Sequence, residues 1–312
     1  MEWYLILLIV ILIVLIFFFV LGLLFFLYMC KPDREKSGSL DGAEGRALQS
    51  YVPKIKEYAL KNAKHNHKAV AIKSFDGLTL RAKEYVNTRK KDWIILVHGY
   101  HSSSSWDFGA SFEMYYEQGL SILALDDRAH GSEGKYIGFG ALDSKDVESW
   151  MDWIIKQYGE ECRIALAGVS MGAATVMMVT GHSRLKQLKC VIEDCGYTSL
   201  KEVVAAITKK KHIPLIPLYY FTSFWSKVLA GYYYSEANPE KAVSQSTVPI
   251  LFIHGDKDGF VPFYMLDRLY NKCAAEKEKV VFEDAVHGES SYKYPDRYKK
   301  TVVSFLNNYI PE

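Results

Sequence analysis

A single serine lies between two glycines in the stretch "GVSMG", where Ser170 follows the apolar run "RIALA" and precedes the small-residue run "AATVMMV". A serine hydroxyl is a weak nucleophile until a base removes its proton. A sharp turn between a strand and a helix would expose the hydroxyl and direct backbone N–H groups at the charge that develops on a carbonyl under attack. Gly168 and Gly172 leave room for such a turn. The spacing G-x-S-x-G therefore predicts that Ser170 is the nucleophile of an acyl transfer.

The base that this serine needs is expected on a late loop of the chain. His287 stands in "VVFEDAVHGES", after the last strand-like run and before the final helical segment. His98 and His254 each stand in an "HG" pair at the end of a strand-like run, which is typical of turn residues that bond the backbone. His130 lies in the loop "DRAHG" at the same predicted edge and is the main rival. We expect His287 to be the base.

The acid that orients the base should precede it in the chain. "HGDKDGFVP" follows the strand-like run "PILFI" and offers Asp256 and Asp258. Asp256 sits directly at the turn and is expected to cap it, whereas Asp258 lies two residues further on and can reach the next loop. We therefore predict a triad of Ser170, Asp258 and His287. Its chain order is that of one of three unrelated serine-hydrolase arrangements.

Two backbone N–H groups are candidates to bind the negative oxygen that forms during acyl transfer. The N–H of Met171 follows the serine directly and is the first predicted donor. The second should come from the loop after "WIILVHG", where Gly99 lets the backbone turn and the N–H of Tyr100 can point into the site. Losing one such donor typically raises the barrier by roughly 3–4 kcal/mol.

Strand-like and helical segments alternate along residues 69–312. A predicted hairpin around Asp76 and Gly77 is followed by six strand-like runs, "WIILVHG", "SILALD", "RIALAG", "KCVIEDCG", "PILFIHG" and "KVVFEDA", with helical segments between them and at the end. This alternation predicts an α/β fold with a mostly parallel sheet covered on both faces. We expect the core in two parts, residues 69–198 and 248–312.

Residues 199–247 interrupt the alternation with a segment rich in aromatic residues, "IPLIPLYYFTSFWSKVLAGYYY". A second membrane span is one interpretation. However, Pro214, Pro217 and Lys227 interrupt the apolar run, and it falls in the middle of a domain. We interpret residues 199–247 as a small helical cap over a pocket.

The chain begins with an apolar run, residues 3–29, that contains no charged residue. As a helix it would span roughly 40 Å, whereas about 20 residues cross a hydrocarbon core. A signal peptide would have a shorter apolar region, a basic start and small residues before its cleavage site. We predict that residues 1–30 are a retained transmembrane anchor that contacts the lipid bilayer through residues 3–29. Residues 31–68 are interpreted as a linker and a leading helix.

Lys31, Arg34 and Lys36 follow the apolar run, and the positive-inside bias favours a domain that faces the cytoplasm. The five cysteines are scattered and odd in number, as in a reducing compartment. A net charge of +2 does not suggest a nucleic-acid partner. No pair of the nine histidines has the spacing of a metal site, so we expect neither metal nor cofactor.

Taken together, the motifs "LVHGY", "DDRAHGSEG", "GVSMG", "HGDKDGFVP" and "VHG" resemble those of the α/β-hydrolase superfamily over residues 69–310. Within it, the chain is similar to bacterial serine hydrolases grouped with serine aminopeptidases, monoacylglycerol lipases and cinnamoyl esterases. The resemblance implies an eight-stranded sheet and the roles given above to Ser170, Asp258, His287, Tyr100 and Met171.

The sequence departs from that group at one motif. "DDRAHGSEG" is one residue short after Gly131, which puts a catalytic role for Ser132 in doubt. We expect Asp126, Arg128 and His130 to hold this loop in place.

The sequence therefore predicts a membrane-anchored serine hydrolase that cleaves an acyl or aryl ester of a small molecule through an acyl-enzyme. One alternative is an aminopeptidase-like amide hydrolase. Another, of a different class, is a non-catalytic membrane-bound binding protein on the same fold. The oligomeric state does not follow from the sequence.

Overall fold

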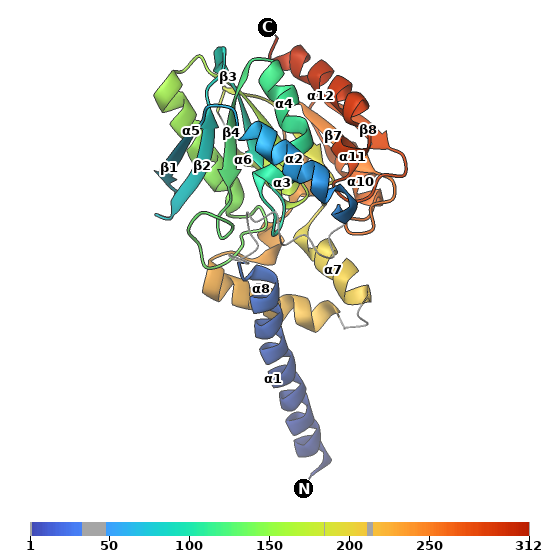
Figure 1. Cartoon of the computed structure of the whole chain (residues 1–312). Helices are drawn as coiled ribbons and strands as arrows, with labels where there is room; N and C mark the ends of the chain where they lie inside the picture. Colours follow the sequence, from blue (N-terminus) through green and yellow to red (C-terminus); the bar gives the residue numbers. More distant parts are fainter. Residues whose placement is uncertain (1, 33–47, 184, 211–214, 312) are drawn as a thin grey trace.

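The computed structural model describes residues 2–32, 48–183, 185–210 and 215–311 (Figure 1). It contains an eight-stranded sheet in the order β1-β2-β4-β3-β5-β6-β7-β8. β2 runs antiparallel to β1 and β4, and the other neighbours are parallel, which confirms the predicted mostly parallel sheet. The strands are β1 (Lys68–Lys73), β2 (Thr79–Tyr85), β3 (Arg89–Val97), β4 (Leu120–Asp126), β5 (Arg163–Val169), β6 (Leu188–Asp194), β7 (Ile250–Gly255) and β8 (Lys277–Phe282).

Helices connect the strands and cover both faces of the sheet, as predicted. Their bounds are α1 (Trp3–Cys30), α2 (Val52–Asn62), α3 (Ser104–Asp107), α4 (Gly109–Glu117), α5 (Asp143–Tyr158), α6 (Met171–His182), α7 (Leu200–Lys210), α8 (Leu215–Ala230), α9 (Pro239–Val243), α10 (Tyr264–Lys272), α11 (Ser290–Lys293) and α12 (Pro295–Tyr309). Two short 3₁₀ helices, η1 (Gln49–Tyr51) and η2 (Tyr234–Glu236), complete the described elements.

Side-chain alternation along the central strands builds two separate cores. In β3, Trp93, Ile95 and Val97 pack on one face together with α5, α6 and α10. Ile94 and Leu96 pack on the other face together with α4 and α12. Because successive side chains of a strand point to opposite faces, a strand covered on both sides is apolar throughout. This explains the continuous apolar run of β3.

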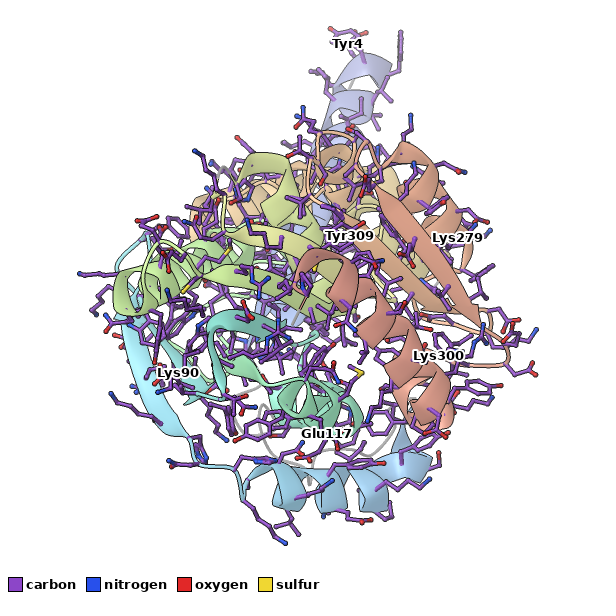
Figure 2. All side chains as sticks on the ribbon, turned by 90° about the horizontal axis from the view of Figure 1, so that it is seen from above. Tyr4, Lys90, Glu117, Lys279, Lys300 and Tyr309 are labelled. Carbon is purple, nitrogen blue, oxygen red and sulfur yellow. The ribbon has the colours of Figure 1, made fainter. Side chains whose placement is uncertain are left out.

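Figure 2 shows how closely two helices lie on the second face. α12, marked by Lys300 and Tyr309, lies beside α4, marked by Glu117, and Lys299 of α12 pairs with Glu117 at 2.6 Å. The ammonium and carboxylate are both about half exposed, so this pair adds at most about 1 kcal/mol. Apolar burial of Tyr298, Val302 and Phe305 is what holds α12 on the sheet.

The predicted leading helix is observed as α2. It packs on the outside of α3 and α4 through Ile55, in a small cluster with Trp106 and Tyr292. The predicted linker falls largely on residues 33–47, which lie outside the described residues.

Among the described residues, α1 is the helix long and apolar enough to cross a membrane, judged by its length and composition. Most of it extends away from the domain (Figure 1). Its C-terminal end is different, because Phe26 and Cys30 are completely buried. The carbonyl of Cys30 accepts a hydrogen bond from the N–H of Ile137 at 2.9 Å, and its thiol lies 3.4 Å from the hydroxyl of Tyr234. This end of α1 is thus part of the core of the domain.

The predicted cap segment contains α7, α8, η2 and α9. Tyr219, Tyr232 and Tyr234 of this segment are buried with Phe26 of α1 and Phe139 of the loop before α5. The cap segment and the end of α1 therefore share one hydrophobic cluster at the end of the domain where α1 leaves it (Figure 1).

Candidate active site

Ser170 occupies a strained turn between β5 and α6. Its backbone angles are φ 57° and ψ −113°, in a region that residues other than glycine rarely adopt. Such strain persists where the surroundings fix the backbone, and it is common at functional sites. Here the N–H of Ser170 donates to the carbonyl of Asp194 at 2.8 Å, which ties the turn to the end of β6.

The two glycines of the motif are required by close backbone contacts. A Cβ atom on Gly168 would lie 2.3 Å from the carbonyl oxygen of Gly172. One on Gly172 would lie 1.9 Å from the carbonyl oxygen of Val97 in β3. The turn therefore packs against its own helix and the neighbouring strand, as the motif predicts.

We expect Gly172→Ala to lower the free energy of unfolding by more than about 4 kcal/mol, because backbone atoms of β3 cannot move aside. The matched control is Gly259→Ala, whose new Cβ would have no atom within 4 Å. Its effect should stay within about 0.5 kcal/mol. Urea unfolding of the two variants, followed by tryptophan fluorescence, measures the difference. Equal midpoints would show that the turn is not tightly packed.

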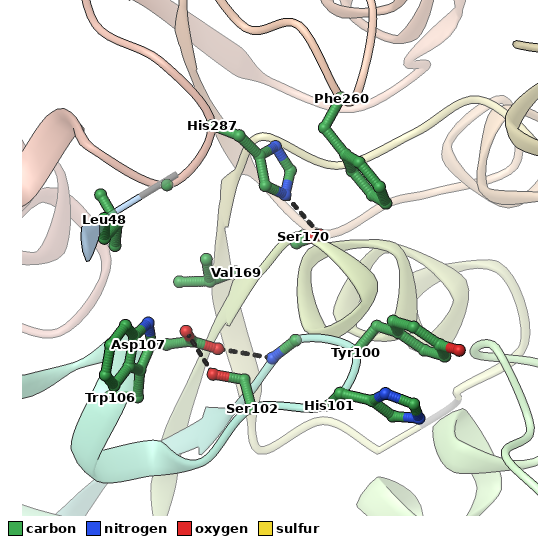
Figure 3. A pocket seen from close by; sticks show the side chains of 12 residues that line it. Leu48, Tyr100, His101, Ser102, Trp106, Asp107, Val169, Ser170, Phe260 and His287 are labelled. Carbon is green, nitrogen blue, oxygen red and sulfur yellow. Dashed lines mark hydrogen bonds between the residues drawn. The ribbon is translucent and has the colours of Figure 1, made fainter. Parts of the chain in front are cut away.

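The structure brings Ser170, His287 and Asp258 together in one hydrogen-bonded chain. Nε2 of His287 lies 2.8 Å from Oγ of Ser170 (Figure 3). Nδ1 of the same ring lies 2.6 Å from Oδ2 of Asp258. A carboxylate can only accept, so Nδ1 carries the hydrogen and Nε2 accepts from the serine hydroxyl. This is the tautomer that a general base needs.

Asp258 is held as a carboxylate by several donors. Its Oδ1 accepts hydrogen bonds from the N–H groups of Phe260 and Val261, at 2.8 and 2.9 Å. Burial by itself would raise the pKa of Asp258, but hydrogen bonds from His254 and His287 outweigh burial and hold that pKa well below its usual range. The loop thus presents a negative charge to the ring of His287.

The loop after β3 places Tyr100 beside the serine turn. The N–H of Gly99 donates to Oδ2 of Asp107 at 2.6 Å, and Oδ1 of Asp107 accepts from the hydroxyl of Ser102 at 2.7 Å (Figure 3). The hydroxyl of Tyr100 donates to the carbonyl of Met29 at 2.9 Å. The loop is therefore fixed from both sides, by α3 and by the end of α1.

The other predicted donor belongs to Met171, the first residue of α6. The first N–H groups of a helix have no carbonyl partner within that helix, and the helix dipole places positive potential there. An oxygen bonded to a carbonyl carbon next to Ser170 Oγ would meet this helix end. The geometry leaves the roles of Tyr100 and Met171 as predictions.

The rival base His130 is engaged in structural contacts. Nδ1 donates to the carbonyl of Arg128 at 3.0 Å, and Nε2 accepts from the N–H of His101 at 3.0 Å. Burial, reinforced by the nearby His98, holds the pKa of His130 well below its ordinary value. His130 therefore braces the loop that carries Tyr100.

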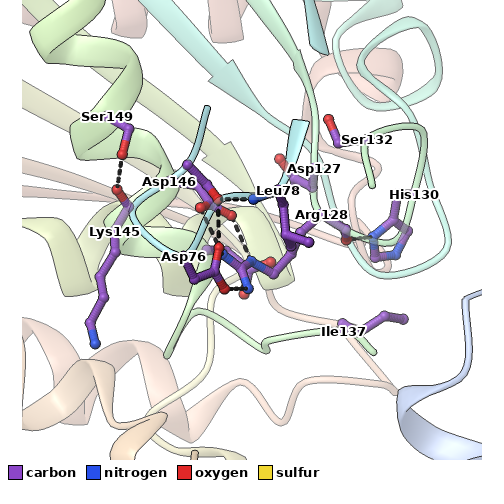
Figure 4. A network of polar contacts seen from close by, with 12 residues as sticks. Asp76, Leu78, Asp127, Arg128, His130, Ser132, Ile137, Lys145, Asp146 and Ser149 are labelled. Atoms are coloured by element: carbon purple, nitrogen blue, oxygen red, sulfur yellow. Dashed lines mark hydrogen bonds and ion pairs between the residues drawn. The ribbon is translucent and has the colours of Figure 1, made fainter. Parts of the chain in front are cut away.

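The motif "DDRAHGSEG" forms a buried polar network rather than a reactive group (Figure 4). The guanidinium of Arg128 binds both oxygens of Asp146, at 2.6 and 2.7 Å, and one oxygen of Asp76 at 3.0 Å. The hydroxyl of Ser132 donates to the carbonyl of Asp126 and accepts from the N–H of Arg81. The expected structural role of the loop and the doubt about Ser132 both agree with these contacts.

Beside the serine lies a pocket of about 330 Å³. Four apolar side chains line it, namely those of Leu48, Trp106, Val169 and Phe260. The one carboxylate among its described lining residues is that of Asp107, which accepts the two hydrogen bonds given above. The pocket therefore presents apolar surface next to Ser170.

Sequence reasoning missed two neighbours of the site. His254 was expected to bond the backbone, and its Nε2 lies 3.2 Å from the carbonyl of Val261, but the same atom lies 3.2 Å from Oδ2 of Asp258. Cys195 follows β6 directly, and its thiol lies within 4.8 Å of Asp258 and His287. Burial holds the pKa of this thiol well above its ordinary value, so it stays protonated.

The strand order and the strained serine turn after the fifth strand define an α/β hydrolase. Comparison with protein-family models identifies the family of the chain. The model of the prolyl oligopeptidase family matches residues 134–312, so the chain belongs to this family. The model of the X-Pro dipeptidyl-peptidase (S15) family matches residues 52–209.

Curated relatives match about three fifths of the chain. It is 28% identical over 197 residues to the uncharacterized protein YqkD of Bacillus subtilis, which covers 62% of this chain and 65% of that protein. It is 26% identical over 194 residues to the uncharacterized protein YfhR of Escherichia coli K12, with 61% of each chain covered. The match thus spans less than two thirds of either relative.

Solved structures show the same fold. The esterase Pf2001 of Pyrococcus furiosus superposes with a TM-score of 0.66 at 25% identity, over 80% of this chain and 94% of that one. Est1E of Butyrivibrio proteoclasticus, solved with ferulic acid, superposes with a TM-score of 0.60 at 19% identity, over 78% and 100%. One of these neighbours is named as an esterase, and the other was solved with ferulic acid bound.

Proposed function

We propose that this α/β hydrolase is a membrane-anchored serine hydrolase that cleaves esters with an apolar acyl or aryl group. The observation that carries the proposal is the chain of hydrogen bonds from Ser170 through His287 to Asp258, with lengths of 2.8 and 2.6 Å. In this mechanism His287 takes the proton of Ser170 as Oγ attacks the carbonyl carbon. The N–H groups of Tyr100 and Met171 stabilise the negative oxygen, and His287 then protonates the leaving group. Water, activated by the same ring, releases the acyl group.

The ester preference is supported by the pocket. An aminopeptidase must hold a charged amine, and a carboxylate that faces this amine forms the strongest hydrogen bond with it. Among the described lining residues, the carboxylate of Asp107 already accepts from the N–H of Gly99 and the hydroxyl of Ser102. The apolar wall around Trp106 and Phe260 suits an acyl chain or ring instead. An esterase among the structural neighbours agrees with this preference.

A peptidase is the second candidate function, because both matching family models carry peptidase names. A peptidase that recognises the acyl side of a blocked or proline-containing peptide would not need a carboxylate for a free amine. The pocket wall around Phe260 could hold a proline ring as well as another apolar group.

Membrane anchoring is supported by the end of α1. A signal peptide is removed from the mature protein. Phe26 and Cys30 have no exposed surface, and the carbonyls of Met29 and Cys30 accept hydrogen bonds from Tyr100 and Ile137. Cleavage after these residues would empty part of the core, so a retained anchor fits the packing better.

Two measurements on the full-length protein in detergent test the function. A fluorophosphonate probe should label the protein at Ser170, and absence of labelling would favour the non-catalytic binding protein. Matched pairs of an ester and an amide with the same apolar acyl group should then be compared, with each rate divided by its spontaneous rate. A larger enhancement for the esters is expected. A larger enhancement for N-blocked prolyl amides would replace the ester proposal by the peptidase.

A further inference from the structure

One face of α8 in the cap segment is apolar and exposed. Ile216, Tyr220, Phe224 and Val228 follow one another at intervals of four residues, with exposed fractions of 70%, 63%, 45% and 57%. Residues four apart lie above one another on a helix, so these side chains form a stripe, called the α8 stripe below. The opposite side of α8 is buried in the domain through Leu218, Thr222 and Ser226. A contiguous apolar patch of this kind marks a surface that contacts something other than water.

The α8 stripe continues the exposed surface of α1. The ring of Phe19 in α1 packs against Phe221, Phe224 and Trp225 of α8, with ring centres 5.9, 5.9 and 4.8 Å apart. The indole N–H of Trp225 donates to the carbonyl of Phe19 at 3.0 Å. In Figure 1, α8 lies across α1 at the level where α1 leaves the domain. A medium that covers the exposed part of α1, such as lipid, would therefore also contact α8.

The length of the exposed part of α1 can be compared with the thickness of a lipid bilayer. Residues 3–20 of α1 are exposed apart from the half-buried Phe18, and as a helix they span about 27 Å. A hydrocarbon core is about 30 Å thick. Its far boundary would lie near Trp3 and Tyr4, and its near boundary at Phe19, beside α8. Aromatic residues gather at such boundaries.

The charges of α8 fit the same position. Its sequence, LIPLYYFTSFWSKVLA, contains one charged residue, Lys227. The ammonium of Lys227 turns back to the carbonyl of Gly231 at 2.9 Å and lies over the ring of Tyr233. A lysine near an apolar face can keep its charge out of the lipid in this way while its stem covers apolar surface.

We propose that α8 lies in the plane of the bilayer surface, with the α8 stripe among the acyl chains next to α1. This proposal rests on the membrane anchoring proposed above. The bilayer would then contact the domain at two places, a spanning helix and an interfacial helix that crosses it. The loop of Tyr100, which bonds the end of α1, lies at this same end of the domain. The site would therefore take acyl substrates that partition into the membrane.

Fluorescent labels on full-length protein in phosphatidylcholine vesicles test the orientation of α8. A polarity-sensitive label is attached to Phe224→Cys, and lipids with a nitroxide on the acyl chain serve as quenchers. Wild-type protein, whose five cysteines are all buried and free, gives the labelling blank. Leu8→Cys on α1 reports membrane insertion itself. Leu60→Cys, which replaces an apolar side chain 70% exposed on α2, is the matched control away from α8. Tyr220→Cys repeats the test if the first variant does not fold.

We expect quenching at position 224 comparable to that at position 8, with none at position 60. Quenching at position 8 but not at 220 or 224 would overturn the proposal for α8 while leaving the anchor in place. No quenching at any position would overturn the membrane anchor and the orientation of α8 together. Concentration-dependent energy transfer between labels at position 224, without quenching, would mean that a second copy of the chain covers the stripe. None of these outcomes depends on hydrolytic activity.

Discussion

Replacing Ser170 by alanine is expected to lower kcat by about six orders of magnitude, the scale seen when the serine of such a triad is removed. The hydroxyl of Ser170 is the group that His287 contacts through Nε2, so no other atom can form the acyl-enzyme along this path. The turn itself should survive, because alanine keeps a Cβ at the same position. Hydrolysis of the best ester from the substrate comparison, measured with enzyme in excess, gives the residual rate.

The neighbouring thiol provides the control for this experiment. Cys195 lies near Asp258 and His287, and its protonated sulfur is not expected to react. Cys195→Ala should therefore retain activity within a few-fold of wild type. Near-normal turnover in Ser170→Ala combined with a large loss in Cys195→Ala would identify a cysteine nucleophile instead.

Asp258→Asn is expected to lower kcat by about 10⁴-fold, the effect of replacing the aspartate of such a triad by its amide. The carboxylate accepts the Nδ1–H of His287 and so keeps Nε2 free to take the proton of Ser170. An amide can donate to Nδ1 and trap the ring in the other tautomer. The matched control is Asp256→Asn. Asp256 accepts from the N–H of Asp284 at 2.7 Å and does not touch His287 in the structure, so a similar loss there would contradict the assignment.

The same residue gives a pH dependence with a definite sign. The folded protein holds the pKa of Asp258 below its ordinary value of about 4. A depressed pKa means that the ionised group adds stability above the unfolded pKa and loses this contribution as pH falls through the folded value. Urea midpoints of wild type and Asp258→Asn, measured from pH 7 to pH 3, should therefore converge only below about pH 4. Convergence near neutral pH would mean that the carboxylate is not held as described.

The convergence of Ser170, Asp258 and His287 was predictable because each follows a strand of the parallel sheet. β5, β7 and β8 end at one edge, and the alternation of apolar runs with helical segments was enough to place them there. The choice of Asp258 over Asp256 depended on reach, but both side chains reach the loop after β8: Asp258 contacts His287, and Asp256 accepts from the N–H of Asp284. The roles themselves stay predictions until the variants are measured.

Two features of the site could not be read from the sequence. The contact of His254 with Asp258 depends on how the loop after β7 bends, which residue types alone do not specify. The embedding of Phe26 and Cys30 was hidden by the uniform composition of α1. A run that is apolar all round carries no sign of which residues face lipid and which face protein.

The buried end of α1 has a consequence for how the protein is made. The thiol of Cys30 lies 3.8 Å from the hydroxyl of Tyr232, a residue 202 positions later in the sequence. At translation rates of 5–20 residues per second, and with α1 as the membrane anchor proposed above, the helix would wait about 10–40 s in the bilayer before that neighbour is synthesised. The domain would thus complete its fold against a segment already inserted. Proteolysis on the N-terminal side of Phe26 would remove the exposed part of α1 and leave the buried residues 26–30 in the domain. Proteolysis on the C-terminal side of Cys30 would also remove Met29, whose carbonyl accepts the hydrogen bond from Tyr100. With the proposed anchor and activity, loss of the lipid-embedded part of α1 and loss of activity would therefore be separable, depending on which side of residues 26–30 the chain is cut.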